Sequence, residues 1–290
     1  MTARQRQLAI LLAPAAVGAV ALVALPAVIT LVTALFQTDL LGPSTYVGLE
    51  NFRELLRDPV FYETLENSLT FAALTVPVRM LGALGLALLL HRPRRGAGAR
   101  RTAAYLPTVI PEVALVIAFT FLLNPVFGPV NGVLAAIGLP QPAWFAEPFP
   151  AMLGLAIISW FTIGEGFLIA LAARQELPEE LYDVARMEGS SRADTLRRVT
   201  LPLMAPVLGL LAARDVALSL QASFAATYLV TDGGPDRATL FLPIYVYDVG
   251  FEQLRYGYAA AMTTAMYLIT AAILFAAWRL LRGGRLAAAR

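Results

Sequence analysis

Long apolar windows constrain this chain more than any other feature of its sequence. An α-helix rises about 1.5 Å per residue, so about 20 apolar residues cross the roughly 30 Å hydrocarbon core of a bilayer. Windows of this length predict spans at 8–36, 68–90, 102–123, 152–173, 203–230 and 258–281. The sequence therefore predicts an all-α integral membrane protein, with six transmembrane helices in a single transmembrane domain over residues 1–290.

Composition supports a membrane protein and excludes several kinds of chemistry. Charged residues make up 14% of the chain, whereas soluble domains have about 25%. The chain has no cysteine, a single histidine and no lysine among its 22 basic residues. It therefore offers no disulfide, no Cys- or His-rich metal site, no Walker A lysine and no Schiff-base lysine. Any ATP hydrolysis is expected to come from another chain.

The arginines predict the orientation of the spans. Most of the 22 arginines fall in segments that share one side when both termini are cytoplasmic, namely the N-terminus, 92–101, 174–198 and 279–290. Because arginine-rich loops stay inside, both termini and these loops are predicted to be cytoplasmic. The first span is longer than a signal-peptide core, so a retained anchor is expected.

Features within and between the spans give further expectations. Several prolines lie inside the windows. Because neighbouring helices can satisfy the carbonyls that a proline leaves unpaired, these prolines predict kinks and not helix ends. They are Pro14, Pro26, Pro77, Pro107 and Pro111. A short surface helix is predicted around Val60 to Glu66, and Asn124 to Pro150 is predicted to be an ordered, irregular cap.

The segment 175–202 between the fourth and fifth spans is too patterned for a simple connector. Pro178 suits a first helical turn, and the acids that follow it suit the positive end of a helix. Leu181, Val184 and Ala185 share one helical face. Gly189 fits a helix C-cap, and Ser190 or Ser191 can N-cap a second helix that ends before Pro202. The alternative is an amphipathic connector that lies on lipid headgroups.

The anchors of this segment resemble the coupling loop of ABC-importer permeases. That family's pattern is E-A-A, three residues, G, nine residues, then I-x-L-P. The chain has Asp183-Val184-Ala185, Gly189 and Val199-x-Leu201-Pro202 at the same offsets, with Asp for Glu and Val for Ala. The resemblance implies a helix-turn-helix that couples the chain to a separate ATPase through Leu181, Asp183, Val184, Ala185, Gly189, Leu201 and Pro202.

The likeness extends to both sides of the loop. The upstream residues look like the fourth span of carbohydrate-type permeases, and they are Trp160, Gly164, Phe167, Leu171, Ala172, Leu177 and Pro178. Downstream, Thr231-Asp232-Gly233-Gly234-Pro235 and the run Tyr256 to Ala261 resemble the maltose and glycerol-phosphate permease group. The resemblance implies the first of two non-identical permeases in a bacterial inner membrane. Its implied partners are a second permease, two ATPase subunits that bind ATP and Mg, and an extracytoplasmic sugar-binding protein or lipoprotein. No cofactor on this chain is implied.

Ionisable residues at membrane depth are candidates for function because an unpaired charge there is costly. They are Arg79, Glu112, Glu165, Arg214 and Asp215. Arg214 and Asp215 are adjacent and are predicted to point to different faces, so each needs a partner on another helix, such as Arg79 for a carboxylate. Structural ion pairs and substrate contacts both remain open.

The fifth span carries the predicted substrate face. Gln221, Phe224, Ala225 and Tyr228 follow i, i+3, i+4, i+7 spacing. An amide can bind sugar hydroxyls and an aromatic ring can stack on a pyranose, so Gln221, Phe224, Tyr228 and Glu165 are predicted pathway residues. Ordinary helix packing is the alternative.

Two other functions remain alternatives to an ATP-driven importer. An ion-coupled secondary transporter would use Glu112, Glu165 or Asp215 as a proton carrier. An intramembrane enzyme would need at least a catalytic carboxylate pair, and the sequence contains no Ser/His/Asp set or phosphate loop to support one. The expected subunit moves its substrate without bond chemistry.

Overall fold

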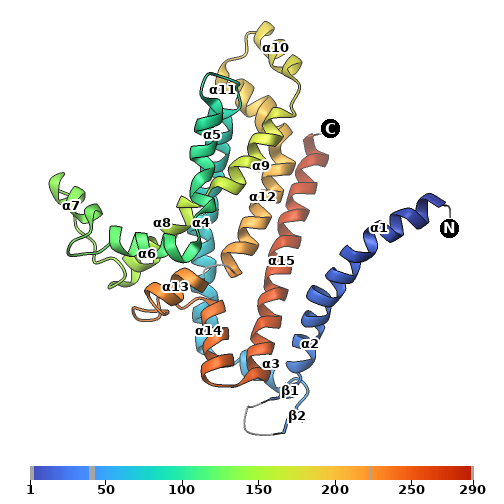
Figure 1. The fold of residues 1–290 in the computed structure, drawn as a ribbon, viewed down its shortest axis with the longest axis vertical. Helices are drawn as coiled ribbons and strands as arrows, with labels where there is room; N and C mark the ends of the chain where they lie inside the picture. Colours follow the sequence, from blue (N-terminus) through green and yellow to red (C-terminus); the bar gives the residue numbers. More distant parts are fainter. Residues whose placement is uncertain (1–2, 39–42, 222–223, 289–290) are drawn as a thin grey trace. The chain divides into compact units, whose positions relative to one another are not determined.

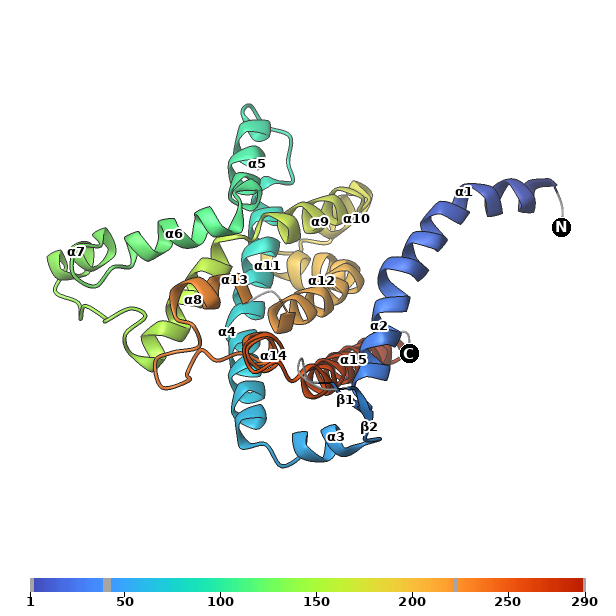
Figure 2. The same cartoon turned by 60° about the horizontal axis from the view of Figure 1, so that its bottom comes forward.

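The computed structural model describes residues 3–38, 43–221 and 224–288, and it is mainly helical (Figures 1 and 2). Contacts divide the chain into two compact units. The first contains Met1–Tyr62 and Tyr245–Ile269, and the second contains Glu63–Ile244 and Thr270–Arg290.

The first unit begins with one long helix that is exposed along its apolar surface. It consists of α1 (Ala3–Ala19), the π-helical turn η1 (Val20–Ala24) and α2 (Leu25–Thr33), with Pro14 inside it. Its most apolar window is 0% buried. Because lipid can cover such a surface, the helix suits the predicted first span.

Short elements connect this helix to the rest of the first unit. Strands β1 (Phe36–Gln37) and β2 (Thr45–Tyr46) pair antiparallel, and α3 (Glu50–Leu55) follows. Asn51 Nδ2 donates hydrogen bonds to the carbonyl oxygens of Ala34 at 2.8 Å and Phe36 at 3.0 Å. A Cβ at Gly257 would lie 2.0 Å from the Phe36 oxygen, so only glycine allows this approach.

A carboxylate joins three segments of the same unit. Asp58 Oδ2 accepts hydrogen bonds from the hydroxyls of Tyr245 and Tyr258, each at 2.6 Å. Burial raises the pKa of Asp58, but the hydrogen bonds from Tyr245 and Tyr258 oppose it and leave this pKa below its usual value. Asp58 was not singled out in the sequence analysis. The remaining elements of the unit are η4 (Asp248–Glu252) and the first part of α15 (Tyr256–Ala288).

The second unit contains most of α4 (Pro59–Leu90), which lines two apolar clusters. One cluster includes Phe71 of α4, Leu155 of α8 (Pro148–Phe161) and the loop residue Phe241. The other includes Ala83 and Ala87 of α4 together with residues of α9 (Gly164–Gln175) and α12 (Leu201–Gln221). The small side chains of α4 let these helices pack closely.

Figure 1 shows the remaining helices of this unit, coloured by their position along the chain. They are α5 (Ala97–Tyr105), η2 (Leu106–Val109), α6 (Glu112–Leu122), α7 (Pro129–Ala136), α10 (Glu179–Met187), α11 (Arg192–Thr195), η3 (Leu196–Thr200), α13 (Phe224–Val230) and the first half of α14 (Leu242–Tyr247). The predicted irregular cap at 124–150 thus contains α7, and the hydrogen bond from Trp144 Nε1 to Asn131 Oδ1, at 2.8 Å, ties α7 to the following loop.

Among the described residues, four helices are long and apolar enough to cross a membrane, or up to six if each of two bent pairs is one span. The predicted third span is one of these pairs, bent by 94° between η2 and α6. The prediction that Pro111 only kinks the helix is therefore wrong. A residue before proline is driven out of the α region, and Ile110 has ψ 131°. Figure 2 shows α6 leading away from α5.

The predicted fourth span is the second bent pair. It bends by 45° between α8 and α9, where Thr162 has φ −96° and ψ 41°. A Cβ at Gly164 would lie 3.1 Å from the Cα of Tyr105, so glycine allows α9 to start against the end of α5. The separate surface helix predicted around Val60 to Glu66 is not present. These residues form the first turns of α4 instead.

Candidate functional site

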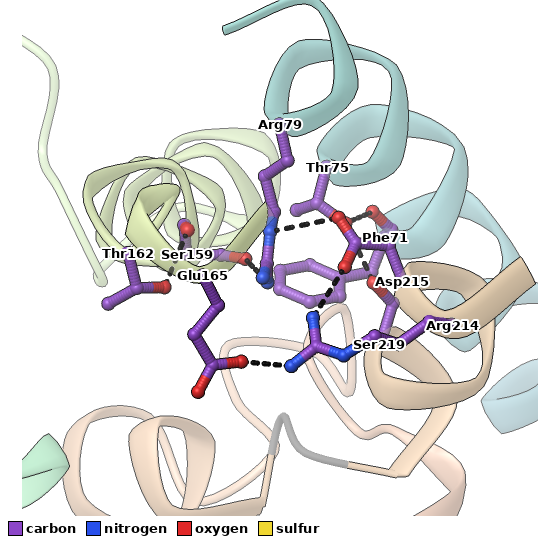
Figure 3. Close-up of polar contacts among 9 residues, drawn as sticks. All are labelled: Phe71, Thr75, Arg79, Ser159, Thr162, Glu165, Arg214, Asp215 and Ser219. Atoms are coloured by element: carbon purple, nitrogen blue, oxygen red, sulfur yellow. Dashed lines mark hydrogen bonds and ion pairs between the residues drawn. The ribbon is translucent and has the colours of Figure 1, made fainter. Parts of the chain in front are cut away.

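Four charged side chains from three helices meet within the second unit (Figure 3). Arg79 comes from α4, Glu165 from α9, and Arg214 and Asp215 from α12. Arg79 Nε lies 3.4 Å from Asp215 Oδ2, and Arg214 pairs with Glu165. The pairing of Arg79 with a carboxylate on another helix agrees with the sequence analysis.

Arg214 and Asp215 each have a partner on another helix, as predicted, but they also contact each other, which was not expected from their different helical faces. Arg214 Nη1 lies 3.3 Å from Asp215 Oδ1. Adjacent helical residues point about 100° apart, but the long arginine side chain bends back to the short aspartate. Arg214 therefore contacts two carboxylates, and Asp215, which is 5% exposed, contacts two guanidinium groups.

A cavity of about 390 Å³ lies beside these charges. Its polar lining consists of three charged and five hydroxyl-bearing residues, which are Arg79, Glu112, Glu165, Thr108, Ser159, Thr162, Ser219 and Thr227. Phe71, Ile110 and Leu155 supply part of the apolar wall. Thr108 comes from η2, Ser159 and Thr162 from the end of α8 and the bend after it, and the other two hydroxyls from α12 and α13.

Two of the hydroxyls have no hydrogen-bond partner among the described residues. They are Thr108 Oγ1 and Thr227 Oγ1, and Thr227 is 0% exposed. Buried hydroxyls nearly always have partners because leaving one unpaired is costly. By contrast, Thr75 Oγ1 and Ser219 Oγ lie 3.3 Å apart, and Arg79 Nη1 donates to Ser159 Oγ at 3.4 Å. The two unpaired hydroxyls are therefore suited to a hydroxylated ligand.

The predicted pathway residues divide between this cavity and its surroundings. Glu165 lines the cavity, as does Glu112, whereas Gln221 ends α12, and the rings of Phe224 and Tyr228 stack in α13 at a centroid distance of 5.4 Å. A face shared by Gln221 and Tyr228 needs one helix through residues 222 and 223, which lie outside the described residues. That face stays a prediction.

The sequence analysis missed Thr108, Ser159, Thr162 and Thr227. Each is a single hydroxyl in a highly apolar stretch, where such residues usually bond to a carbonyl one turn earlier. Thr108, Ser159 and Thr162 lie near the two helix bends, which the sequence did not predict, whereas Thr227 lies within α13.

The segment after α9 is the second feature of interest. Pro178 precedes α10, with Glu179 and Glu180 in its first turn. Gly189 has φ +77°, the left-handed conformation that favours glycine. Ser191 Oγ then accepts a hydrogen bond from Asp194 N at 3.1 Å as the N-cap of α11.

The sequence analysis predicted that the second helix of this segment ends before Pro202, and this prediction is wrong. It continues from α11 through the π-helical turn η3 into α12, which begins with Leu201 and Pro202. Pro202 lies inside this continuous helix and has no N–H to donate to the preceding turn. The wider π-helical turn η3 directly before it accommodates the missing hydrogen bond.

The residues of α10 differ in exposure. Leu181 is 41% exposed and Val184 is 47% exposed, whereas Ala185 is 6% exposed. Met187, which the sequence analysis did not select, is 81% exposed. Asp183 is exposed and pairs with Arg186 on its own helix. The α10 segment projects beyond the ends of α9 and α12 (Figure 1).

A bundle of apolar helices around a polar cavity defines a membrane transport protein. The chain matches the family described as "Binding-protein-dependent transport system inner membrane component" over residues 79–283. It is 33% identical to the probable ABC transporter permease protein YurN of Bacillus subtilis, over 82% of this chain and 84% of that protein. It is also 32% identical to the diacetylchitobiose uptake system permease protein NgcF of Streptomyces coelicolor, over 82% of this chain and 72% of that protein.

A solved structure has the same fold. A chain in the crystal structure of a bacterial ABC transporter involved in the import of the acidic polysaccharide alginate superposes with TM-score 0.80 and 24% identity, covering 96% of both chains. The present chain therefore belongs to the family of binding-protein-dependent inner-membrane permeases of ABC transporters. It is a transport subunit that crosses the inner membrane several times.

Proposed function

We propose that this chain is a permease subunit of an ATP-driven importer for a sugar, oligosaccharide or sugar derivative. Family membership and the diacetylchitobiose-importing relative support this proposal. The chain supplies half of the translocation pathway, and a second, non-identical permease supplies the other half. Two ATPase subunits bind ATP and Mg, and an extracytoplasmic binding protein delivers the sugar.

The cavity beside Arg79 is the observation that carries the sugar assignment. Its hydroxyls, carboxylates and guanidinium group can exchange hydrogen bonds with sugar hydroxyls, while Phe71 and Leu155 offer apolar contact. Thr108 and Thr227 would find in a sugar the partners that the described residues do not provide.

The charges around the cavity favour a neutral sugar over an acidic one. Arg79, the cation in its lining, is already paired with Asp215. Glu165 in the same lining is paired with Arg214, whereas Glu112 adds a carboxylate that has no cationic partner among the described residues. A uronate, sulfonate or phosphate would therefore meet an excess of negative charge, and bringing like charges together in a partly dry site is unfavourable.

Reconstitution of the complete complex with its binding protein tests this function. Neutral sugars are expected to stimulate ATP hydrolysis and uptake, and sugars with a carboxylate are not. Thr227→Val, which removes a hydroxyl at nearly constant volume, is expected to lower uptake about tenfold, since one buried polar group left unpaired costs about 1 to 3 kcal/mol.

The matched control for this experiment is Thr120→Val. The hydroxyl of Thr120 bonds to the Val116 carbonyl at 2.9 Å and does not line the cavity. Stimulation by acidic sugars alone would refute the neutral-sugar assignment. Uptake by this chain alone, driven by a proton gradient, would favour the ion-coupled alternative.

The α10 segment is the proposed coupling helix. Exposed Leu181 and Val184 would enter a cleft of the ATPase, Asp183 would meet a donor there, and Gly189 would hold the turn. Rigid docking would let closure of the ATPase rock the attached α9 and α12. This proposal places the loop 175–202 and both termini in the cytoplasm.

Cysteine labelling tests this topology. The chain has no native cysteine, so Ser190→Cys creates a single thiol. A membrane-impermeant maleimide is expected to label it in inverted vesicles and not in intact cells, because the loop faces the cytoplasm. A cysteine at Gln141, in the predicted outer cap, should show the reverse pattern. Labelling of Ser190→Cys in intact cells would contradict the proposed orientation.

A further inference from the structure

A buried arginine connects the base of α9 to α10. Arg174, in the last turn of α9, is 4% exposed. Charged residues are almost never buried to this extent without a partner. The guanidinium carbon of Arg174 lies 4.1 Å from the ring centroid of Tyr182, and Nη2 lies 3.8 Å from Glu179 Oε1. Both contacts are with α10.

The two contacts differ in character. The carboxylate of Glu179 is 70% exposed, so solvent weakens this pair. The ring of Tyr182 is partly buried and covers one face of the guanidinium, where a cation–π contact is stronger because water is excluded. Tyr182 is therefore the main partner that holds Arg174.

The same tyrosine also reaches the beginning of the next span. Its hydroxyl lies 3.1 Å from Thr200 Oγ1, and Thr200, the last residue of η3, is 3% exposed. One side chain of α10 thus bridges the end of α9 and the start of α12. Beside it, Gln175 Nε2 donates a hydrogen bond to the His91 carbonyl at 3.3 Å, which fixes the end of α9 to the end of α4.

We propose that Arg174, Tyr182 and Thr200 are positioning residues that clamp α10 to α9 and α12. The inference rests on the proposed coupling function of α10. A nine-residue helix that is attached only by its two connecting turns would rotate when the ATPase presses on it. The turns would then bend, and the spans would not move. The clamp makes α10 move as one body with the spans, so that ATPase closure is converted into movement of the pathway.

The clamp can be weakened without touching the exposed face of α10. Arg174→Leu removes the cation and keeps apolar bulk, and Tyr182→Phe removes the hydroxyl and keeps the ring. A nitroxide on Met187→Cys, at an 81% exposed position of the cysteine-free chain, reports the motion of α10. Arg174→Lys retains a cation, and Arg100→Leu removes an exposed arginine from α5 as a control.

We expect both clamp variants to insert and to bind the ATPase. Their nitroxide spectra should show a mobile component that the unsubstituted chain lacks, and sugar moved per ATP hydrolysed should fall about fivefold. Arg174→Lys should recover part of the coupling, and Arg100→Leu should change neither measurement. If Arg174→Leu does not insert, Tyr182→Phe gives the same readout.

Two measurements separate the clamp from the coupling function. Nitroxide mobility in the chain without ATPase tests the clamp alone, and unchanged mobility in both Arg174→Leu and Tyr182→Phe would overturn it. Increased mobility with unchanged sugar moved per ATP would overturn the positioning role. If the unsubstituted chain binds no ATPase, the proposed function fails, whatever the mobility of α10.

Discussion

Gly189→Val is expected to uncouple ATP hydrolysis from transport while the chain still inserts and pairs with its partner permease. Gly189 has φ +77°, and an added Cβ would meet nothing within 4 Å, so the penalty comes from the backbone and not from a clash. A strained residue costs about 1 to 3 kcal/mol. The turn also holds the hydrogen bond from Ser190 N to Ala185 O at 2.9 Å, which a changed backbone would break.

We therefore expect sugar-stimulated ATP hydrolysis to fall between about fivefold and about 150-fold, since 1.4 kcal/mol corresponds to a factor of ten. The measurement is ATPase activity of the reconstituted complex with and without sugar-loaded binding protein. Gly96→Val is a closely matched control, because Gly96 has φ +76°, equally open surroundings and a position in another loop. Full coupling in Gly189→Val, or an equal loss in Gly96→Val, would show that α10 has no special role.

Some structural features of this protein could be predicted from its sequence, and others could not. The windows predicted from hydropathy overlap the four candidate membrane helices and the two bent pairs among the described residues, because burial in lipid depends on local composition. Hydropathy did not predict the 94° bend before α6, because the same Pro-containing windows could hold a kinked or a broken helix. Pro77 lies inside α4 whereas Pro111 precedes α6, and the packing of Gly164 against Tyr105 is the kind of tertiary contact that separates the two outcomes.

The candidate sites show the same division between local and tertiary information. Turn chemistry predicted the helix around Leu181, the positive φ of Gly189 and the cap at Ser191, since each depends on neighbours in sequence. A partner for Arg79 among the carboxylates of other helices was predicted as an electrostatic need, and the structure identifies it as Asp215. The cavity hydroxyls and the contact of Arg174 with Tyr182 depend on how separate helices pack together. No local sequence pattern predicts that packing.

Asp215→Ala should be the most destabilising of the single substitutions beside the cavity. Among the described residues, Arg79 would keep only Ser159 Oγ, at 3.4 Å, as a polar partner, and its side chain is 14% exposed. Removing one partner of a buried ion pair costs about 3 to 5 kcal/mol because the remaining charge is uncompensated. Arg214 would still retain Glu165. The expected result is a much lower unfolding temperature of the purified complex and less complex in the membrane.

Arg79→Met combined with Asp215→Leu distinguishes a structural pair from a substrate contact. Replacing both charges by apolar residues of similar volume removes the desolvation cost, so stability should return to near that of the unsubstituted chain. Glu165→Ala breaks the more exposed pair with Arg214, at 48% and 33% side-chain exposure, and should cost at most about 1 kcal/mol. If the double variant is stable and transports sugar normally, the pair is structural. If it is stable and transport is lost, Arg79 or Asp215 contacts the sugar. An Asp215→Ala complex as stable as the unsubstituted one would contradict the buried pair.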